Sequence, residues 1–181
     1  MKPIEYDPAI VTKNRICAII AQSDSVRSAL NYKGIDAKYD YNPEDPLSLV
    51  WNCIIPALKD PDTITTADPQ ILVGIRTQDN ENDPRTVWCL VTVVVVINYS
   101  DLRSDYQYRR EDLMYEGISD ASKPDAIAHY IVEALASDES KSWIGDIKLV
   151  DRDEGSLNNS MHYAVTLQFE VRDINIGSRG V

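Results

Sequence analysis

The sequence predicts an α+β fold with a mainly antiparallel sheet of four to five strands flanked by helices. Three segments predict it. The run from Thr86 to Asn98 is rich in β-branched residues without polar alternation, which is typical of a strand that is apolar on both faces. The segment from Met161 to Val171 alternates apolar and polar residues, as a strand with one buried face does. Residues Ile127 to Leu135 repeat apolar side chains at helical spacing, which indicates an amphipathic helix.

The length and composition predict one domain. A chain of 181 residues, 44% of them hydrophobic, suffices for a single core, which we place at about residues 10–174 of a domain that spans 1–181. Residues 174–181 show no periodicity and are expected to form a loosely ordered tail. The longest apolar stretch, Val87 to Asn98, is shorter than the roughly 20 residues of a membrane-spanning helix, and the N-terminus has no signal-peptide pattern. We therefore expect a soluble protein without a membrane partner.

The first predicted element is helical. Apolar residues recur at helical spacing from Ile10 to Leu30 and are interrupted around residues 23–25, so the pattern predicts one broken helix or two short ones. Asp24 or Ser25 is a suitable N-cap for the second piece, and Gly34 is suited to end it. The tyrosine-rich stretch from Tyr32 to Pro46 is expected to be loop or extended chain.

The next predicted elements are strands. The apolar segment from Asn52 to Leu58 is broken by Pro56, which indicates an edge strand or an extended connection. The segment from Gln70 to Arg76 is typical of a strand, and a polar loop from Gln78 to Arg85 joins it to the long apolar strand as a hairpin. The polar and aromatic stretch from Asp101 to Arg110 either continues that strand or forms an arm.

The C-terminal third predicts a helix and two strands. Ser122 is a suitable N-cap, Pro124 fits the first turn, and Asp125 adds an acidic residue there, so a helix follows and covers one face of the sheet. The segment from Ile144 to Val150 predicts a short strand, and the charged stretch from Asp151 to Gly155 predicts a loop before the last strand.

The charge of the chain bears on its partners. With 29 acidic and 18 basic residues the formal net charge is −11, which opposes binding to a phosphate backbone because such binding relies on lysine and arginine. Solubility alone explains most acidic proteins, but the same charge suits a surface past which DNA slides or one that imitates DNA. Cys17, Cys53 and Cys89 lie in apolar surroundings without metal-site spacing and are expected to be reduced core residues.

Catalytic, metal and cofactor sites are not expected. His129 and His162 are the two histidines, and neither has a nucleophile or carboxylate at a spacing that would form a catalytic set. The loop from Asp79 to Asp83 superficially suggests a calcium loop, but Pro84 and Leu90 occupy positions that need glycine and glutamate. No glycine loop precedes Lys-Ser or Lys-Thr, so no cofactor is indicated.

An interface is the functional feature that the residues indicate. A strand that is apolar on both faces needs other parts of the protein or a partner to cover both of them. The tyrosines and arginines that follow this strand have the composition of a protein interface. The alternative is that these tyrosines only line the end of the sheet. The candidate subunit or partner contacts are Trp88, Val94, Val96, Tyr99, Arg103, Tyr106, Tyr108, Arg109 and Arg110.

The order of these segments resembles that of the tail terminator, or tail completion, proteins of tailed phages. The resemblance spans roughly residues 10–174 and lies in pattern and order. Its pieces are an N-terminal helix, a segment with the pattern I-x-P-A-L followed by P-D-T, a strand over Pro69 to Ile75, the valine-rich strand, a polar arm, the helix from Asp125 to Ala136, and the strand from Tyr163 to Val171. The stretch from Asn31 to Trp51 is longer than a minimal terminator needs, which leaves a related neck or tail-completion role open.

The resemblance implies a noncatalytic virion protein that assembles as a hexameric ring. Such a ring caps the tail tube, contacts the tube protein and the head-side neck or connector protein, and lets DNA pass through its lumen without specific binding. The protein would be made in the host cytoplasm and reside at the junction of tail and neck. Alternatives are another phage neck or tail-completion adaptor, an acidic DNA mimic, and a small metal-dependent enzyme. Interspersed acids and bases disfavour the mimic, because it needs carboxylates spaced like phosphates.

Overall fold

The computed structural model describes residues 7–30, 42, 44–45, 47–59, 64, 68–79, 87–102, 108–109, 120–157 and 161–172. Its helices are α1 (Pro8–Gln22), α2 (Asp24–Leu30), α3 (Tyr99–Leu102), α4 (Lys123–Ala136) and α5 (Asp138–Ile144). Its strands are β1 (Ile54–Ile55), β2 (Gln70–Asp79), β3 (Val87–Asn98), β4 (Tyr108–Arg109), β5 (Asp120–Ala121), β6 (Asp146–Ser156) and β7 (His162–Arg172). None of the helices in these ranges is long and apolar enough to cross a bilayer.

The main sheet has five strands in the order β1-β2-β3-β7-β6. The predicted α+β class is confirmed, and the predicted hairpin joins β2 to β3. The sheet is nevertheless mixed, because β1 pairs in parallel with β2 while the other neighbours are antiparallel. Residues 56–69 separate the two parallel strands, which meets the dozen or so residues that a parallel crossover needs.

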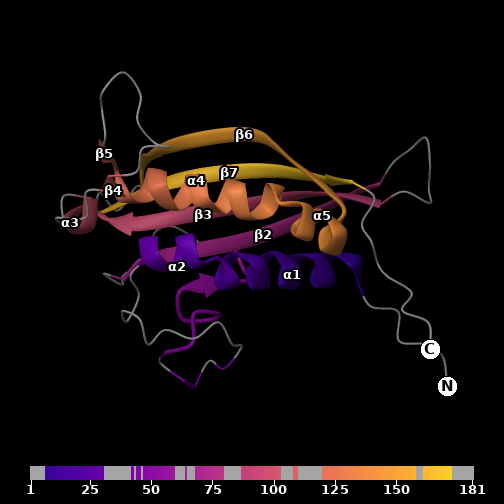
Figure 1. The fold of residues 1–181 in the computed structure, drawn as a ribbon, viewed down its shortest axis with the longest axis horizontal. Coiled ribbons are helices and arrows are strands. Elements are labelled where there is room, and N and C mark those ends of the chain that lie inside the picture. Colours follow the sequence, from indigo (N-terminus) through magenta and orange to yellow (C-terminus); the bar gives the residue numbers. More distant parts are fainter. Residues whose placement is uncertain are drawn as a thin grey trace.

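Helices α1, α2, α4 and α5 all lie on one side of the main sheet (Figure 1). We call the sheet surface beneath them the helix face and the opposite surface the open face. Because side chains alternate along a strand, every second residue of β3 points to the helix face. These residues, Cys89, Val91, Val93, Val95 and Ile97, are all fully buried in the main core.

The break between α1 and α2 occurs at Ser23, within the interruption that the sequence predicted, but Ser23 caps the second helix instead of Asp24 or Ser25. The Ser23 backbone N–H donates to the carbonyl oxygen of Ile19 at 3.1 Å and so ends α1. Its hydroxyl accepts a hydrogen bond from the Val26 backbone N–H at 3.4 Å, and Asp24 is already the first residue of α2. One serine therefore ends the first helix and caps the second.

Helix α4 forms where it was predicted, and α5 was not predicted. The Ser122 hydroxyl accepts from the Asp125 backbone N–H at 3.4 Å, as an N-cap does. Helix α5 follows directly, with Ser137 as its N-cap and Gly145 at its end. Gly145 has a φ of 115°, a conformation that favours glycine, and it turns the chain into β6.

Strand β6 differs from the prediction at both ends. It begins at Asp146, because Ile144 belongs to α5, and it runs through the charged stretch that was expected to be a loop. A bulge between Leu149 and Asp151 shifts its register against β7. The apolar strand β3 ends at Asn98 and α3 follows, so the strand does not continue into residues 101–110. Gly34, residues 80–83 and the tail 174–181 lie outside the described residues.

Candidate subunit interface

The open face carries partly exposed apolar side chains in its middle. Trp88, Leu90, Thr92 and Val94 occupy the open-face positions of β3, and each is partly exposed. The cross-strand partners place Leu90 between Arg76 of β2 and Glu170 of β7. Because each subunit leaves these positions incompletely covered, they are available to a partner.

One end of the open face is covered by the chain itself. Ile55, Ile64, Leu72, Val96 and Ala164 form a second buried cluster there, separate from the main core. Val96, which we expected at an interface, is only 1% exposed, so its side chain is buried within the chain itself.

Leu58 extends this cover along β2. An ideal Cβ atom on Gly74 would lie 2.4 Å from the Leu58 Cγ atom, which shows that leucine packs directly on the glycine backbone. Gly74 stands opposite Thr92 on the open face. A residue with any side chain at position 74 would displace Leu58, so this close approach explains the glycine.

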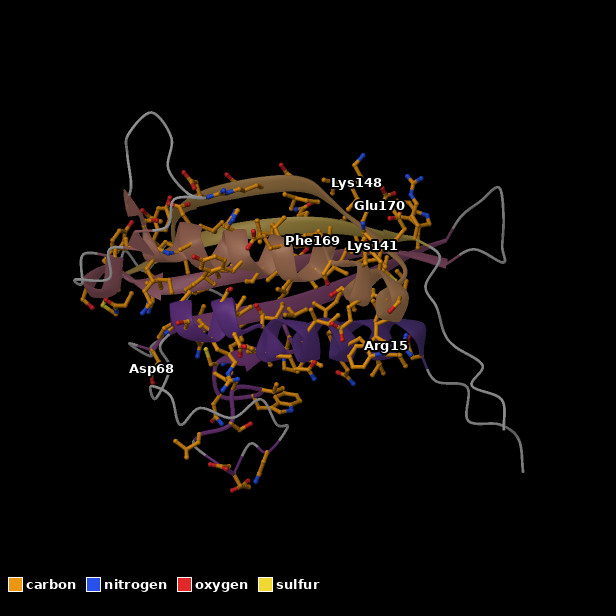
Figure 2. All side chains as sticks on the ribbon, in the orientation of Figure 1. Arg15, Asp68, Lys141, Lys148, Phe169 and Glu170 are labelled. Atoms are coloured by element: carbon orange, nitrogen blue, oxygen red, sulfur yellow. The ribbon has the colours of Figure 1, made fainter. Side chains whose placement is uncertain are left out.

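Charges of both signs border the apolar positions. Arg172 donates two hydrogen bonds through Nη2 to the Glu170 carboxylate, at 3.0 and 3.1 Å. Lys148 of β6 is the cross-strand partner of Glu170 of β7. Figure 2 labels the two side chains next to each other. The open face is therefore an apolar strip with a mixed charged border, the arrangement of a protein interface with a polar rim.

Tyr99 anchors the end of β3 where the predicted arm begins. Its ring contacts that of Tyr163 edge to face, with ring centroids 6.3 Å apart, and its hydroxyl bonds to the Ser156 hydroxyl. Burial, together with the negative charges of Glu154 and Asp125, raises the pKa of Tyr163. The contacts of Tyr99 with Tyr163 and Ser156 therefore hold the start of α3 against the sheet.

An ion-pair network ties β6 to the start of α4 beside this aromatic pair. The Arg152 Nη2 atom lies 2.5 Å from the Asp125 Oδ1 atom and 3.5 Å from the Glu154 Oε2 atom. Asp125 also accepts a hydrogen bond from the Ser122 hydroxyl. Arg152, from the stretch that was predicted to be a loop, therefore joins β6 to α4 through Asp125 and also pairs with Glu154.

The structure brings only part of the predicted interface set together. Trp88 and Val94 lie on the open face, and Tyr99 lies at its end. Tyr108 and Arg109 are the two residues of strand β4, which pairs with β5. Arg103, Tyr106 and Arg110 lie outside the described residues. The prediction missed Leu90 and Arg76 on the open face.

Period-two alternation from Trp88 would have identified Leu90. Arg76 requires the register between β2 and β3, which one sequence does not give.

The histidines and cysteines do not form a reactive cluster in the described part of the chain. His129 Nε2 lies 3.4 Å from Glu133 on the same helix, and His162 is buried on β7. Burial raises the pKa of the Cys17 and Cys53 thiols to about 12 and that of Cys89 to about 11. No group of three or more metal-binding side chains occurs among the described residues.

Comparison with known families identifies a family for most of the chain. Residues 23–171 match the family model described as YomW. No curated protein matches the chain.

Proposed function

The chain belongs to the YomW family, which is phage-derived, and from this premise we propose that it is a noncatalytic virion protein that caps the phage tail tube as a ring and joins it to the neck. Its partners are further copies of itself, the tail tube protein and the head-side connector protein. It acts at the junction of tail and neck after synthesis in the host cytoplasm. Its work is done by surfaces, without a catalytic residue or a cofactor.

The incompletely covered open face is the observation that supports this proposal most. Trp88, Leu90 and Val94 of β3 are apolar and partly exposed, whereas the residues of β3 that point to the helix face are fully buried in the main core. Arg76, Glu170 and Lys148 border them, so a partner meets an apolar centre and a charged rim. A subunit in a ring needs surfaces of this kind, because every copy contacts two neighbours through different patches.

The charge of the chain supports the passage of DNA. A formal charge of −11, which already counts the arginines of the described ion pairs, gives each copy a net repulsion toward phosphates. A ring lumen lined by carboxylates would let DNA pass without adhering to it. Strong binding of the free protein to duplex DNA at low salt would contradict this part of the proposal.

Mass measurement and electron microscopy test the ring. Light scattering of the purified protein, alone and with purified tail tubes, should give six copies of 20.4 kDa, about 122 kDa, or density at one tube end. A strict monomer that also fails to bind tube ends would contradict the proposal. Binding to connector rings but not to tubes would instead favour a neck adaptor.

A variant pair assigns the assembly to the open face. Leu90→Asp places a charge in the apolar strip at a partly exposed position, whereas Val150→Asp changes a valine that is 47% exposed at the sheet edge. We expect the first variant to lose assembly while remaining folded and the second to assemble normally. Equal assembly of both variants would show that the open face is not the contact.

A further inference from the structure

A groove lies on the helix side of the sheet, between α1 and the corner of α4 and α5. Its volume is about 230 Å³, and Ile19, Ala134 and Trp143 supply its apolar lining. Trp143 is 45% exposed, so its ring is open to a partner. The groove therefore offers an aromatic wall on the opposite side of the sheet from the open face (Figure 1).

The unpaired charge that lines this groove is negative. Ser137 and Ser140 also line it, but both hydroxyls donate to one carbonyl oxygen near the end of α4, at 2.9 and 2.6 Å. Glu139 is exposed, and among the residues that the structure describes nothing pairs with its carboxylate. The groove thus combines an apolar wall with a carboxylate that is available to a cation.

The basic side chains beside the groove already have partners. Figure 2 labels Arg15 of α1 and Lys141 of α5 at this end of the molecule. Arg15 donates to the Trp143 carbonyl oxygen at 2.5 Å, and the Lys141 Nζ atom lies 4.0 Å from the Asp138 Oδ1 atom. Neither is paired with the carboxylate that lines the groove, so this carboxylate selects a cationic side chain from a partner.

The open face carries a cation of the matching kind. Arg76 of β2 is exposed there, with Leu90 of the apolar strip as its cross-strand partner. Within the described ranges no carboxylate pairs with its guanidinium group. Glu170 lies beyond Leu90 on β7, but it accepts two hydrogen bonds from Arg172 and stands opposite Lys148.

We propose that Arg76 of one copy enters the groove of the next copy and pairs there with Glu139. A cavity of about 150 Å³ holds a benzene molecule, so 230 Å³ has room for a guanidinium group and part of its stem. The methylene stem packs on Ile19 and on the Trp143 ring, where the cation is also attracted by the ring face. The planar guanidinium group then donates to the carboxylate.

A second copy is the occupant that satisfies both surfaces at once. The unpaired cation lies beside the apolar strip, and the unpaired acid lies beside the apolar groove, so one docking event covers the apolar groups and pairs the charges. The two surfaces lie on opposite sides of the sheet (Figure 1). Their contact is therefore heterologous, and it closes into a ring when the rotation between copies permits. The inference rests on the proposed ring and names one contact within it.

Exchange of the two charges tests the contact. The variants are Arg76→Glu, Glu139→Arg and the double variant that carries both changes. The readout is the protein concentration at which half of the chains are assembled, in solution or on tail tubes. We expect each single change to raise this concentration at least about tenfold, because it places like charges together in the contact. The double variant restores the pair and should assemble as the wild type does.

A mismatched double variant is the control. Glu133 is exposed on α4, near the groove but outside its lining, and it is paired with His129 of the same helix. Glu133→Arg alone should assemble normally, and its combination with Arg76→Glu should stay as impaired as Arg76→Glu alone. Far-UV circular dichroism checks that each variant is folded, and if one of the two single reversals does not fold, the other decides the question.

The outcomes separate this contact from the proposed function. A wild-type ring that persists unchanged in both single variants overturns the contact and leaves the ring intact. Single variants that fail and are not restored by the double exchange overturn the pairing of Arg76 with Glu139. A wild-type chain that forms no ring, alone or on tail tubes, overturns both the contact and the proposed function.

Discussion

The two faces of β3 are built from similar residues but have different surroundings. Val91, Val93 and Val95 point to the helix face and are fully buried, while Leu90, Thr92 and Val94 point to the open face and stay partly exposed. Four helices cover the first face, whereas the described chain covers only one end of the second. An apolar sequence thus predicts a need for cover, and the fold decides whether the subunit itself supplies it.

The largest expected effect comes from breaking the helix face. Phe169→Ala removes a ring that is 2% exposed in the main core. We expect the free energy of unfolding to fall by about 3–5 kcal/mol, because a large cavity forms beneath the helices. Denaturant unfolding followed by circular dichroism measures it. A loss below about 1 kcal/mol would mean that the helices pack loosely on the sheet.

A matched pair on one strand measures the difference between the faces directly. Val93→Thr buries a hydroxyl on the helix face, and Val94→Thr places the same group on the open face. The first should lower the free energy of unfolding by about 1–3 kcal/mol and the second by less than about 0.5 kcal/mol, since a partly exposed hydroxyl keeps its water. Equal losses in the monomer would show that the two faces are equally buried.

A smaller effect comes from loosening the helix that covers the core. Ser122→Ala removes the N-cap of α4 and a hydrogen bond to Asp125. We expect a loss of about 1 kcal/mol in thermal unfolding, because the first turn keeps an unpaired N–H. Ser142→Ala, at an exposed position of α5, is the control and should cause little change.

The effect that is smallest at neutral pH comes from ionisation of the three thiols of the buried core, which changes the free energy of unfolding only at alkaline pH. Folding raises the pKa of Cys17 and Cys53 to about 12 and of Cys89 to about 11, from an ordinary value of 9.0. The unfolded thiols ionise first, so this contribution to stability is complete below pH 9 and is lost as the pH rises toward 11–12. Denaturant unfolding at pH 7 and pH 10 measures it. Cys53→Ala should weaken the pH dependence, and an unchanged slope would contradict the assignment.

Much of the fold follows from local pattern. Strand β7 alternates, α4 has a serine cap and an apolar stripe, and β3 is too β-branched for a helix, so each was predicted nearly to its ends. Helix α5 was missed because its seven residues are mostly polar, although Ser137, two acids and Gly145 mark its ends. The full length of β6 was missed because its bulge breaks the alternation and its second half is charged.

The candidate site was less predictable than the fold. The apolar run was enough to place Trp88 and Val94 on a face that needs a partner. It was not enough to show that Val96 is buried, because Ile55 and Ile64 reach it from a segment far away in the sequence.

The bulge in β6 has a consequence for how copies of this protein avoid one another. The outer edge of the described sheet is a long strand whose backbone groups would otherwise template fibril growth by strand addition. The bulge between Leu149 and Asp151 kinks that edge, and Arg152, Asp153 and Glu154 add charges along it. This edge is thereby protected from open-ended strand addition, and association is left to side-chain contacts, which stop when they are satisfied.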